Sequence, residues 1–182
     1  MATSKTGSFW LTEIVECTVD STAVQGTIDL GAYVDVGDQQ ALAVEQVDFI
    51  FQRKNATNDY SAEVEQVTTL GPGVADVQIT DLNPSALMVR ADDNTLIASG
   101  ALHIDGVNYI VTPSSDFFPD NFGKLDESRM VVNDNLYMVG ELNATIAAGE
   151  TLVIAARIKA RIVKLSTKDW MAIAIQSTAA DN

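Results

Sequence analysis

The side chains that most often perform catalysis are scarce in this chain. His103 is its only histidine and Cys17 is its only cysteine. A Ser-His-Asp triad would need His103, but no Gly-x-Ser-x-Gly turn is present, and neither common phosphate-binding glycine pattern occurs. Paired carboxylates could hydrolyse glycosides, but aromatic residues, which usually form sugar platforms, make up only 7% of the chain. The sequence therefore predicts a protein that is not an enzyme and needs no cofactor.

The remaining reactive groups are more consistent with structural roles. His103 lies in the middle of an expected strand, and Cys17 follows an alternating apolar run, which predicts a small buried side chain. One histidine cannot build a His-rich metal site. The oxygen-rich segments 92–94 and 116–127 offer calcium ligands, but neither matches an EF-hand loop, and Asp and Asn are common turn residues. No metal site is predicted.

One group of charges stands out. Arg157, Lys159 and Arg161 recur at a spacing of two, so they share one face of a strand and form what we call the basic stripe. The chain has 25 acidic and 11 basic residues, a net charge of −14, so a concentration of positive charge is unusual in it. The stripe is either a solvated face balanced by acidic neighbours, or a docking surface for another subunit, lipid headgroups or packaged nucleic acid. We treat its three residues as candidates for a subunit interface.

A long loop supplies the second set of interface candidates. Residues 112–127 contain two prolines and three phenylalanines, and a loop of this length without secondary structure is commonly functional. Phe117, Phe118 and Phe122 would form an exposed apolar patch, and such patches mark interaction sites. We expect at least one of them to be buried against another subunit.

These candidates must be positioned by a mainly β structure. Val, Ile and Thr supply 48 of the 182 residues, and β-branched side chains favour strands. Turn signals separate the expected strands, which cover residues 9–19, 27–36, 41–52, 62–69, 74–80, 87–91, 96–104, 107–112, 130–132, 136–142 and 151–165. Ser166 and Asp169 resemble a helix start, and apolar residues then recur every three or four positions. The sequence predicts one domain over residues 1–182, with a flexible N-terminus at 1–8 and a C-terminal helix at 166–178.

The alternation of side chains also predicts which residues form the core. On the strand at residues 41–52, Val47, Phe49 and Phe51 are expected to point inward, with Ile158 and Ile162 opposite or near them. Leu42, Val44 and Ile50 then fall on the other face. Trp10 and Trp170 are expected to anchor the core at the two ends of the chain.

Strand number and spacing predict the fold class. About 8–10 strands separated by turns, without any β-α-β alternation, indicate an all-β antiparallel jelly-roll sandwich with one short C-terminal helix. The chain has no run of roughly 18 apolar residues and no apparent signal peptide. Its acidity opposes general binding to nucleic acid, so no sequence-specific nucleic-acid partner is expected.

The segment Thr27–Gln52 resembles early strands of single-jelly-roll major capsid proteins from tailless icosahedral viruses of archaea and bacteria. It contains Ala-Leu-Ala-Val-Glu-Gln-Val-Asp-Phe after a short turn, and the late strand 151–165 followed by a helix start is similar in style. The resemblance covers about a third of the chain and transfers no functional residue. It implies a virion capsid subunit, assembled in the host cytoplasm, that stands upright in pseudo-hexameric capsomers. The implied partners are further copies of the chain, a second capsid protein and an internal membrane.

The residues leave two other classes of protein open beside a self-assembling capsid subunit. An enzyme is the less favoured of the two, because catalytic side chains are so few. The other is a non-enzymatic surface β-sandwich that binds carbohydrate or protein. The few aromatic residues and the apparent lack of a signal peptide disfavour it.

Overall fold

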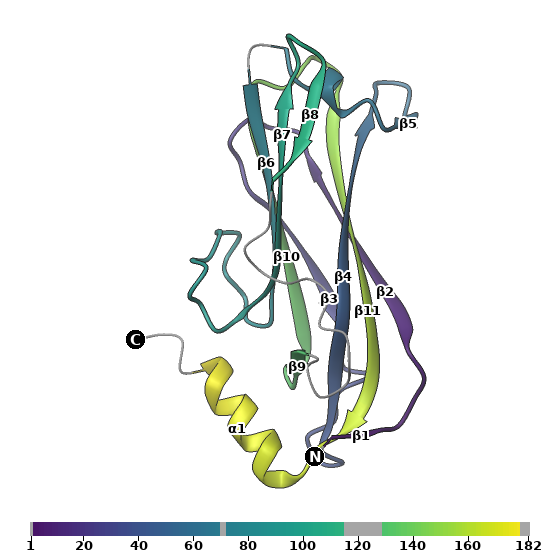
Figure 1. The fold of residues 1–182 in the computed structure, drawn as a ribbon, viewed down its shortest axis with the longest axis vertical. Coiled ribbons are helices and arrows are strands. Elements are labelled where there is room, and N and C mark those ends of the chain that lie inside the picture. Colours follow the sequence, from purple (N-terminus) through teal and green to yellow (C-terminus); the bar gives the residue numbers. More distant parts are fainter. Residues whose placement is uncertain (1, 70–71, 115–128, 179–182) are drawn as a thin grey trace.

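Two antiparallel β-sheets face each other and form an elongated sandwich, with one α-helix at one end (Figure 1). The structure is a computed structural model that describes residues 2–69, 72–114 and 129–178. Within these ranges, no helix is long and apolar enough to cross a membrane.

The sheets are named here after two of their inner strands, β11 and β10. The β11 sheet consists of β1 (Thr3–Ser4), β2 (Phe9–Cys17), β4 (Gln40–Lys54), β5 (Tyr60–Ser61), β9 (Arg129–Val131) and β11 (Thr151–Lys164). The β10 sheet consists of β3 (Val24–Asp29), β6 (Pro72–Thr80), β7 (Leu96–Asp105), β8 (Ile110–Pro113) and β10 (Asn135–Asn143). The helices are the 3-10 helix η1 (Val64–Val67) and α1 (Thr167–Thr178).

The strand order makes this sandwich a jelly roll. The strands run β2–β11–β4–β9 across one sheet and β3–β10–β6–β7 across the other. Most connections therefore cross from one sheet to the other, as in a pair of Greek keys. The predicted fold class, an antiparallel jelly-roll sandwich with a short C-terminal helix, is confirmed.

The main core lies between the sheets, and it contains only part of the predicted set. Val47 and Ile158 are cross-strand partners and are both buried. Phe49 and Phe51 are half-buried and pack against this core. Ile162 lies on the same face as Ile158 and pairs with the core residue Leu42, but it is half-exposed and belongs to neither buried cluster, so it lies at the margin of the core.

A β-bulge at Glu45 changes which residues of β4 face the core. Lys159 pairs with Gln46 and Ala160 pairs with Val44, so Glu45 has no partner on β11. The extra residue shifts the alternation by one, as bulges do. Leu42 and Val44 consequently lie in the same core as Val47. The prediction that they occupy the opposite face is wrong, because strict alternation does not allow for a bulge.

Three segments predicted as strands have a different structure over part or all of their length. β3 ends at Asp29, where the carboxylate Oδ1 accepts the Gly31 N–H at 2.8 Å and turns the chain away from the sheet. The continuation to residue 36 is therefore wrong. Residues 64–67 form η1, and residues 87–91 belong to the loop between β6 and β7.

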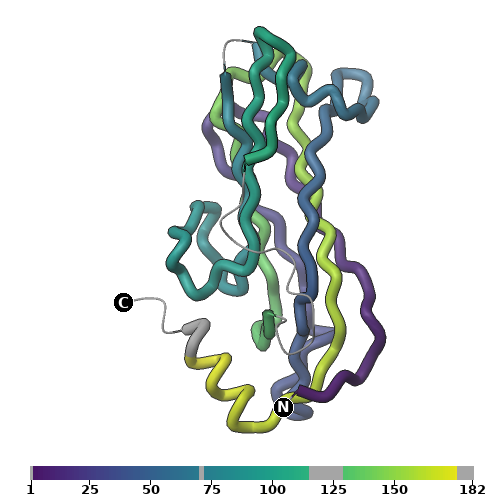
Figure 2. Tube along the Cα trace, in the orientation of Figure 1, coloured from purple at the N-terminus to yellow at the C-terminus, as the bar shows by residue number. Residues whose placement is uncertain are grey.

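The C-terminal helix is confirmed, and it begins with a capping interaction. Ser166 Oγ accepts the Asp169 N–H at 3.2 Å and donates to Asp169 Oδ2 at 2.8 Å. Trp170 and Ile173 pack with Val163 in a second buried cluster on the outer side of the β11 sheet. Strand β1 lies within the N-terminal segment predicted to be flexible, and it pairs with the end of β11. Figure 2 shows β1 at the same end of the molecule as α1.

Candidate assembly surface on the β11 sheet

The basic stripe lies on the outer face of the β11 sheet, opposite the core. Ile154, Ala156 and Ile158 are buried between the sheets. Because successive side chains of a strand point to opposite faces, Ala155 and Arg157 point outward. Strand pairing arranges the outward side chains in three rows: Ile14–Ala155–Ile50, Thr12–Arg157–Asp48 and Trp10–Lys159–Gln46.

Arg157 is the exposed member of the stripe, and its guanidinium lies over the indole ring of Trp10 at 4.7 Å from the ring centroid. Its cross-strand neighbour Asp48 instead accepts a hydrogen bond from the Gln46 amide at 2.7 Å. Neither Arg157 nor the half-exposed Lys159 forms an ion pair with any residue in the described ranges. Among the described residues, no carboxylate lies within ion-pair distance of either positive charge.

Arg161 has a different environment. It forms an ion pair with Glu45, the bulge residue, whose side chain is only 5% exposed. Ser8 Oγ donates to the other oxygen of this carboxylate at 2.7 Å and accepts from Arg161 at 3.2 Å. The bulge thus places a buried carboxylate against the end of the stripe, and Arg161 neutralises it.

The structure adds an apolar component that sequence reasoning missed. Trp10, Ile14 and Ile50 are 45%, 53% and 38% exposed on the outer face of the β11 sheet. Trp10 was expected to be a core anchor, but it points away from the core and supports Arg157 instead. Trp170 is partly buried in the second cluster. The other predicted interface residues, Phe117, Phe118 and Phe122, lie outside the described residues.

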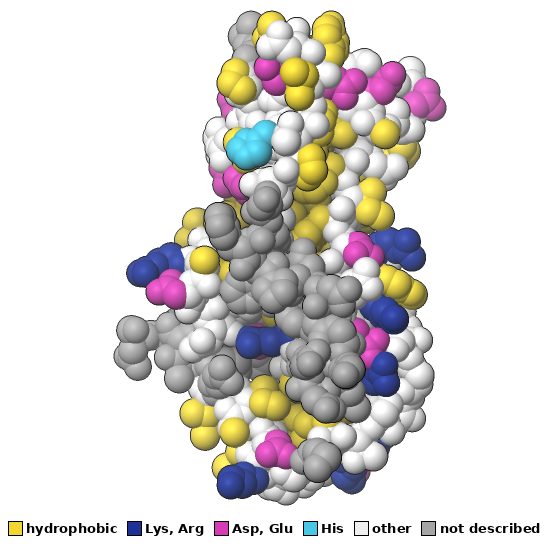
Figure 3. Space-filling view, viewed as in Figure 1, with side chains coloured by type: hydrophobic (Ala, Val, Ile, Leu, Met, Phe, Trp, Pro, Cys, Tyr) yellow, Lys and Arg dark blue, Asp and Glu magenta, His cyan; other side chains and the backbone are white. Residues whose placement is uncertain are grey.

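The two sheets carry opposite net charge. The strands of the β11 sheet contain seven Lys or Arg against four Asp or Glu, whereas those of the β10 sheet contain four Asp or Glu and no Lys or Arg. The acidic residues of the β10 sheet are Asp29, Asp76, Asp105 and Glu141. On the face seen in Figure 3, Lys and Arg lie at mid-height and below, and the upper third carries acidic and apolar side chains.

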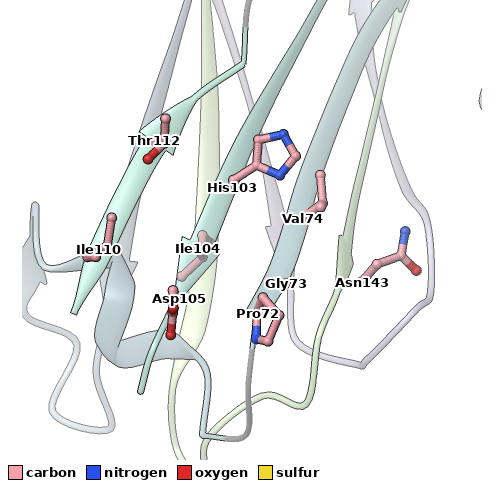
Figure 4. Close-up of a pocket in the computed structure, with 9 residues that line it drawn as sticks. All are labelled: Pro72, Gly73, Val74, His103, Ile104, Asp105, Ile110, Thr112 and Asn143. Atoms are coloured by element: carbon pink, nitrogen blue, oxygen red, sulfur yellow. The ribbon is translucent and has the colours of Figure 1, made fainter. Parts of the chain in front are cut away.

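The outer face of the β10 sheet contains an acidic pair and a hollow. Asp76 and Glu141 are direct cross-strand partners, and partial burial raises the pKa of Asp76. Next to this pair lies a hollow of about 280 Å³ in which side chains of β6, β7 and β8 meet (Figure 4). Its lining includes Val74, Ile110 and His103. His103 is an exposed strand residue, in agreement with its predicted place in a sheet.

The chemistry of the other reactive groups follows from their surroundings. Cys17 is fully buried, as predicted, and burial together with Glu141 raises the pKa of its thiol to about 11. Such a thiol is protonated at neutral pH and is therefore a poor nucleophile. Asp105 accepts hydrogen bonds from Asn108 and Val107 in the β7–β8 turn, and these bonds lower its pKa. Within the described ranges, no three His, Cys, Asp or Glu side chains gather as metal ligands would.

No protein-family model and no curated protein matches this chain. Among solved structures, it is similar to VP1 of Trichodysplasia spinulosa-associated polyomavirus in complex with GM1 oligosaccharide, with a TM-score of 0.46 and 10% identity over 90% of this chain and 96% of the other. It is also similar to the empty head of turnip yellow mosaic virus, with a TM-score of 0.32 and 8% identity over 90% and 86% of the two chains. Similarities this distant carry no functional assignment.

Proposed function

We propose that this chain is a structural subunit of a viral capsid and that its copies join by lateral contacts into capsomers of an icosahedral shell. The observation that carries the proposal is the strand order, β2–β11–β4–β9 facing β3–β10–β6–β7. Viral capsid domains are a major class of jelly roll. Lectin domains and cupins share the architecture, so the fold supports the proposal by analogy and needs a second observation.

The second support is the outer face of the β11 sheet. It combines an exposed tryptophan and two exposed isoleucines with the charges of Arg157 and Lys159. Trp and Arg are the residue types most enriched among those that contribute strongly to protein interfaces. A surface of this composition favours contact with another protein over contact with water alone.

The proposal extends to the setting of the shell. The sequence resemblance favours a tailless icosahedral virus of archaea or bacteria, with the subunit located in the virion after assembly in the host cytoplasm. The partners would be further copies of the chain, a second capsid protein at special positions of the shell, and an internal membrane beneath it.

The test is the assembly state of the purified chain. Light scattering after size-exclusion chromatography, with negative-stain electron microscopy of the same fractions, should show rings or shells as protein concentration rises. Particle yield should depend on salt, because contacts between exposed charges are screened. A chain that stays monomeric at all concentrations and salt levels would contradict the proposal. If such a monomer bound an oligosaccharide, it would fit the surface-module alternative.

A further inference from the structure

We propose that the outer face of the β11 sheet docks onto the outer face of the β10 sheet of a second copy, with Arg157 and Lys159 against Asp76 and Glu141. This inference rests on the proposed function and specifies its lateral contact. It is drawn from the charges of the two sheets and from the order of side chains along their strands.

The charge distribution favours a second copy as the occupant. The β11 sheet carries the excess of basic residues, and the β10 sheet has acidic residues without any Lys or Arg. Contact between two β11 faces would oppose like charges, as would contact between two β10 faces. Contact of one face with the other brings opposite charges together, which steers association and rejects wrong orientations.

The strands of the β10 sheet contain no Lys or Arg that could compensate the acidic pair. Asp76 and Glu141 lie directly opposite each other on β6 and β10, and like charges in this position are destabilising. Both are half-exposed and face outward, since their neighbours Val77 and Leu142 point into the core. Cations from a second copy would offset this repulsion.

Each face also has a second contact row at the same distance from its charged row, formed by exposed isoleucines on one face and by a partly apolar hollow on the other. On the β11 sheet, the row of Ile14 and Ile50 lies two residues from the row of Arg157. On the β10 sheet, the hollow beside Val74 and His103 lies two residues from the row of Asp76. Two residues along a strand correspond to about 7 Å on either face. The exposed isoleucines and the hollow can therefore meet when the charges meet.

The direction of the rows determines how the copies are oriented. One end of the sandwich contains the end of β2 at Cys17, the β7–β8 turn and the start of β11 (Figure 1). On each face, the contact row with Ile14 or Val74 lies nearer to this end than the charged row does. Both rows therefore match when the two copies point the same way. Such a contact joins different surfaces and is heterologous, so its repetition gives a ring if the rotation between copies closes, and an open filament if it does not.

Charge exchange tests this pairing. Replacing Arg157 and Lys159 with Glu, or Asp76 and Glu141 with Lys, should each abolish particles. The variant with all four changes should assemble again, because the reversed faces match each other. A matched control replaces Asp38 and Asp134 with Lys. These exposed residues lie in loops at the other end of the sandwich and give the same change in net charge. The control should assemble like the unchanged protein.

Circular dichroism and thermal melting will show whether each variant is folded. When the unchanged chain forms particles, either of two results shows that the pairing is wrong. One is normal assembly of Asp76→Lys/Glu141→Lys, and the other is a folded fourfold variant that stays unassembled. If the unchanged chain forms no particles, the proposed function fails as well. The variant with Glu at positions 157 and 159 can also be mixed with the variant with Lys at positions 76 and 141. The pairing is supported if particles form only when both variants are present. It is contradicted if the mixture stays unassembled.

Discussion

The guanidinium of Arg157 lies over the indole ring of Trp10, 4.7 Å from its centroid, while the carboxylate of the neighbouring Asp48 is hydrogen-bonded by Gln46. The arginine is therefore held in place by an aromatic face, and its charge has no ion-pair partner among the described residues. Holding a long side chain in this way lowers the entropy that it loses when it binds.

Replacing Arg157 with Gln should weaken assembly far more than folding. The lost cation–π contact is worth about 0.5–1 kcal/mol at an exposed site. Urea unfolding of the monomer should show a loss of this size, and sedimentation should show fewer particles. Lys164→Gln is the matched control, since it removes an exposed cation from the same strand. Equal loss of assembly in both variants would mean that only total charge matters.

The ion pair between Arg161 and Glu45 should be essential for stability. Replacing Arg161 with Met leaves a buried carboxylate without its cation, and breaking buried pairs costs about 3–5 kcal/mol. The double variant Arg161→Met/Glu45→Gln should recover part of this loss. Denaturant unfolding of both single variants and the double variant gives the coupling energy. Additive losses would show that the two side chains act independently.

Gly140 should tolerate no side chain. A Cβ built at this position would lie 2.8 Å from Val15 Cγ2 and 3.1 Å from Ile154 Cδ1, both in the core. Gly140→Ala should destabilise the chain by about 1–3 kcal/mol through overpacking. Adding Val15→Ala should make the cost of Gly140→Ala smaller, which a thermodynamic cycle measures. An unchanged cost would mean that Val15 does not limit the space.

Stability should depend on pH through Asp81. Burial raises the pKa of this carboxyl from its ordinary 3.8 to about 6, although Arg129 partly opposes the shift and Asp93 adds to it. Between these values the folded chain keeps a proton that the unfolded chain releases, so stability falls as pH rises. Asp81→Asn should therefore raise the melting temperature at pH 7.5 and change it little near pH 4. A difference that does not vary with pH would contradict this.

Glu150 provides a comparison of opposite sign. Arg53 donates to both of its carboxylate oxygens, at 2.5 and 2.7 Å, and these bonds lower the pKa of Glu150. Its contribution to stability is complete above its ordinary pKa and is lost in acid. Glu150→Gln should destabilise the chain at pH 7.5, and the difference should shrink as pH falls below 4. Persistence of the full difference at low pH would show that the contribution is not electrostatic.

Composition and local pattern were enough to predict the fold class, because β-branched residues and turn signals act over short distances. The helix start at Ser166 and Asp169 and the burial of Cys17 are local properties of the same kind. The bulge at Glu45 was not predictable in this way. It depends on the pairing of β4 with β11, which are about a hundred positions apart in the chain.

The candidate surface was predictable only in part for the same reason. The spacing of Arg157, Lys159 and Arg161 placed them on one face, but only the register of three strands brings Trp10 to Arg157 and Glu45 to Arg161. The acidic pair of Asp76 and Glu141 comes from strands far apart in sequence, so no local pattern could have indicated it. Whether the phenylalanines of the 112–127 loop contribute to an interface stays a prediction.

Cryo-electron microscopy of the assembled chain would test the central claim most directly, because it shows which faces are in contact. We expect rings or shells in which the β11 face of each copy, with Arg157 and Lys159, lies against the β10 face of the next. Monomers alone, or particles in which Arg157 and Lys159 face bulk solvent, would contradict the account.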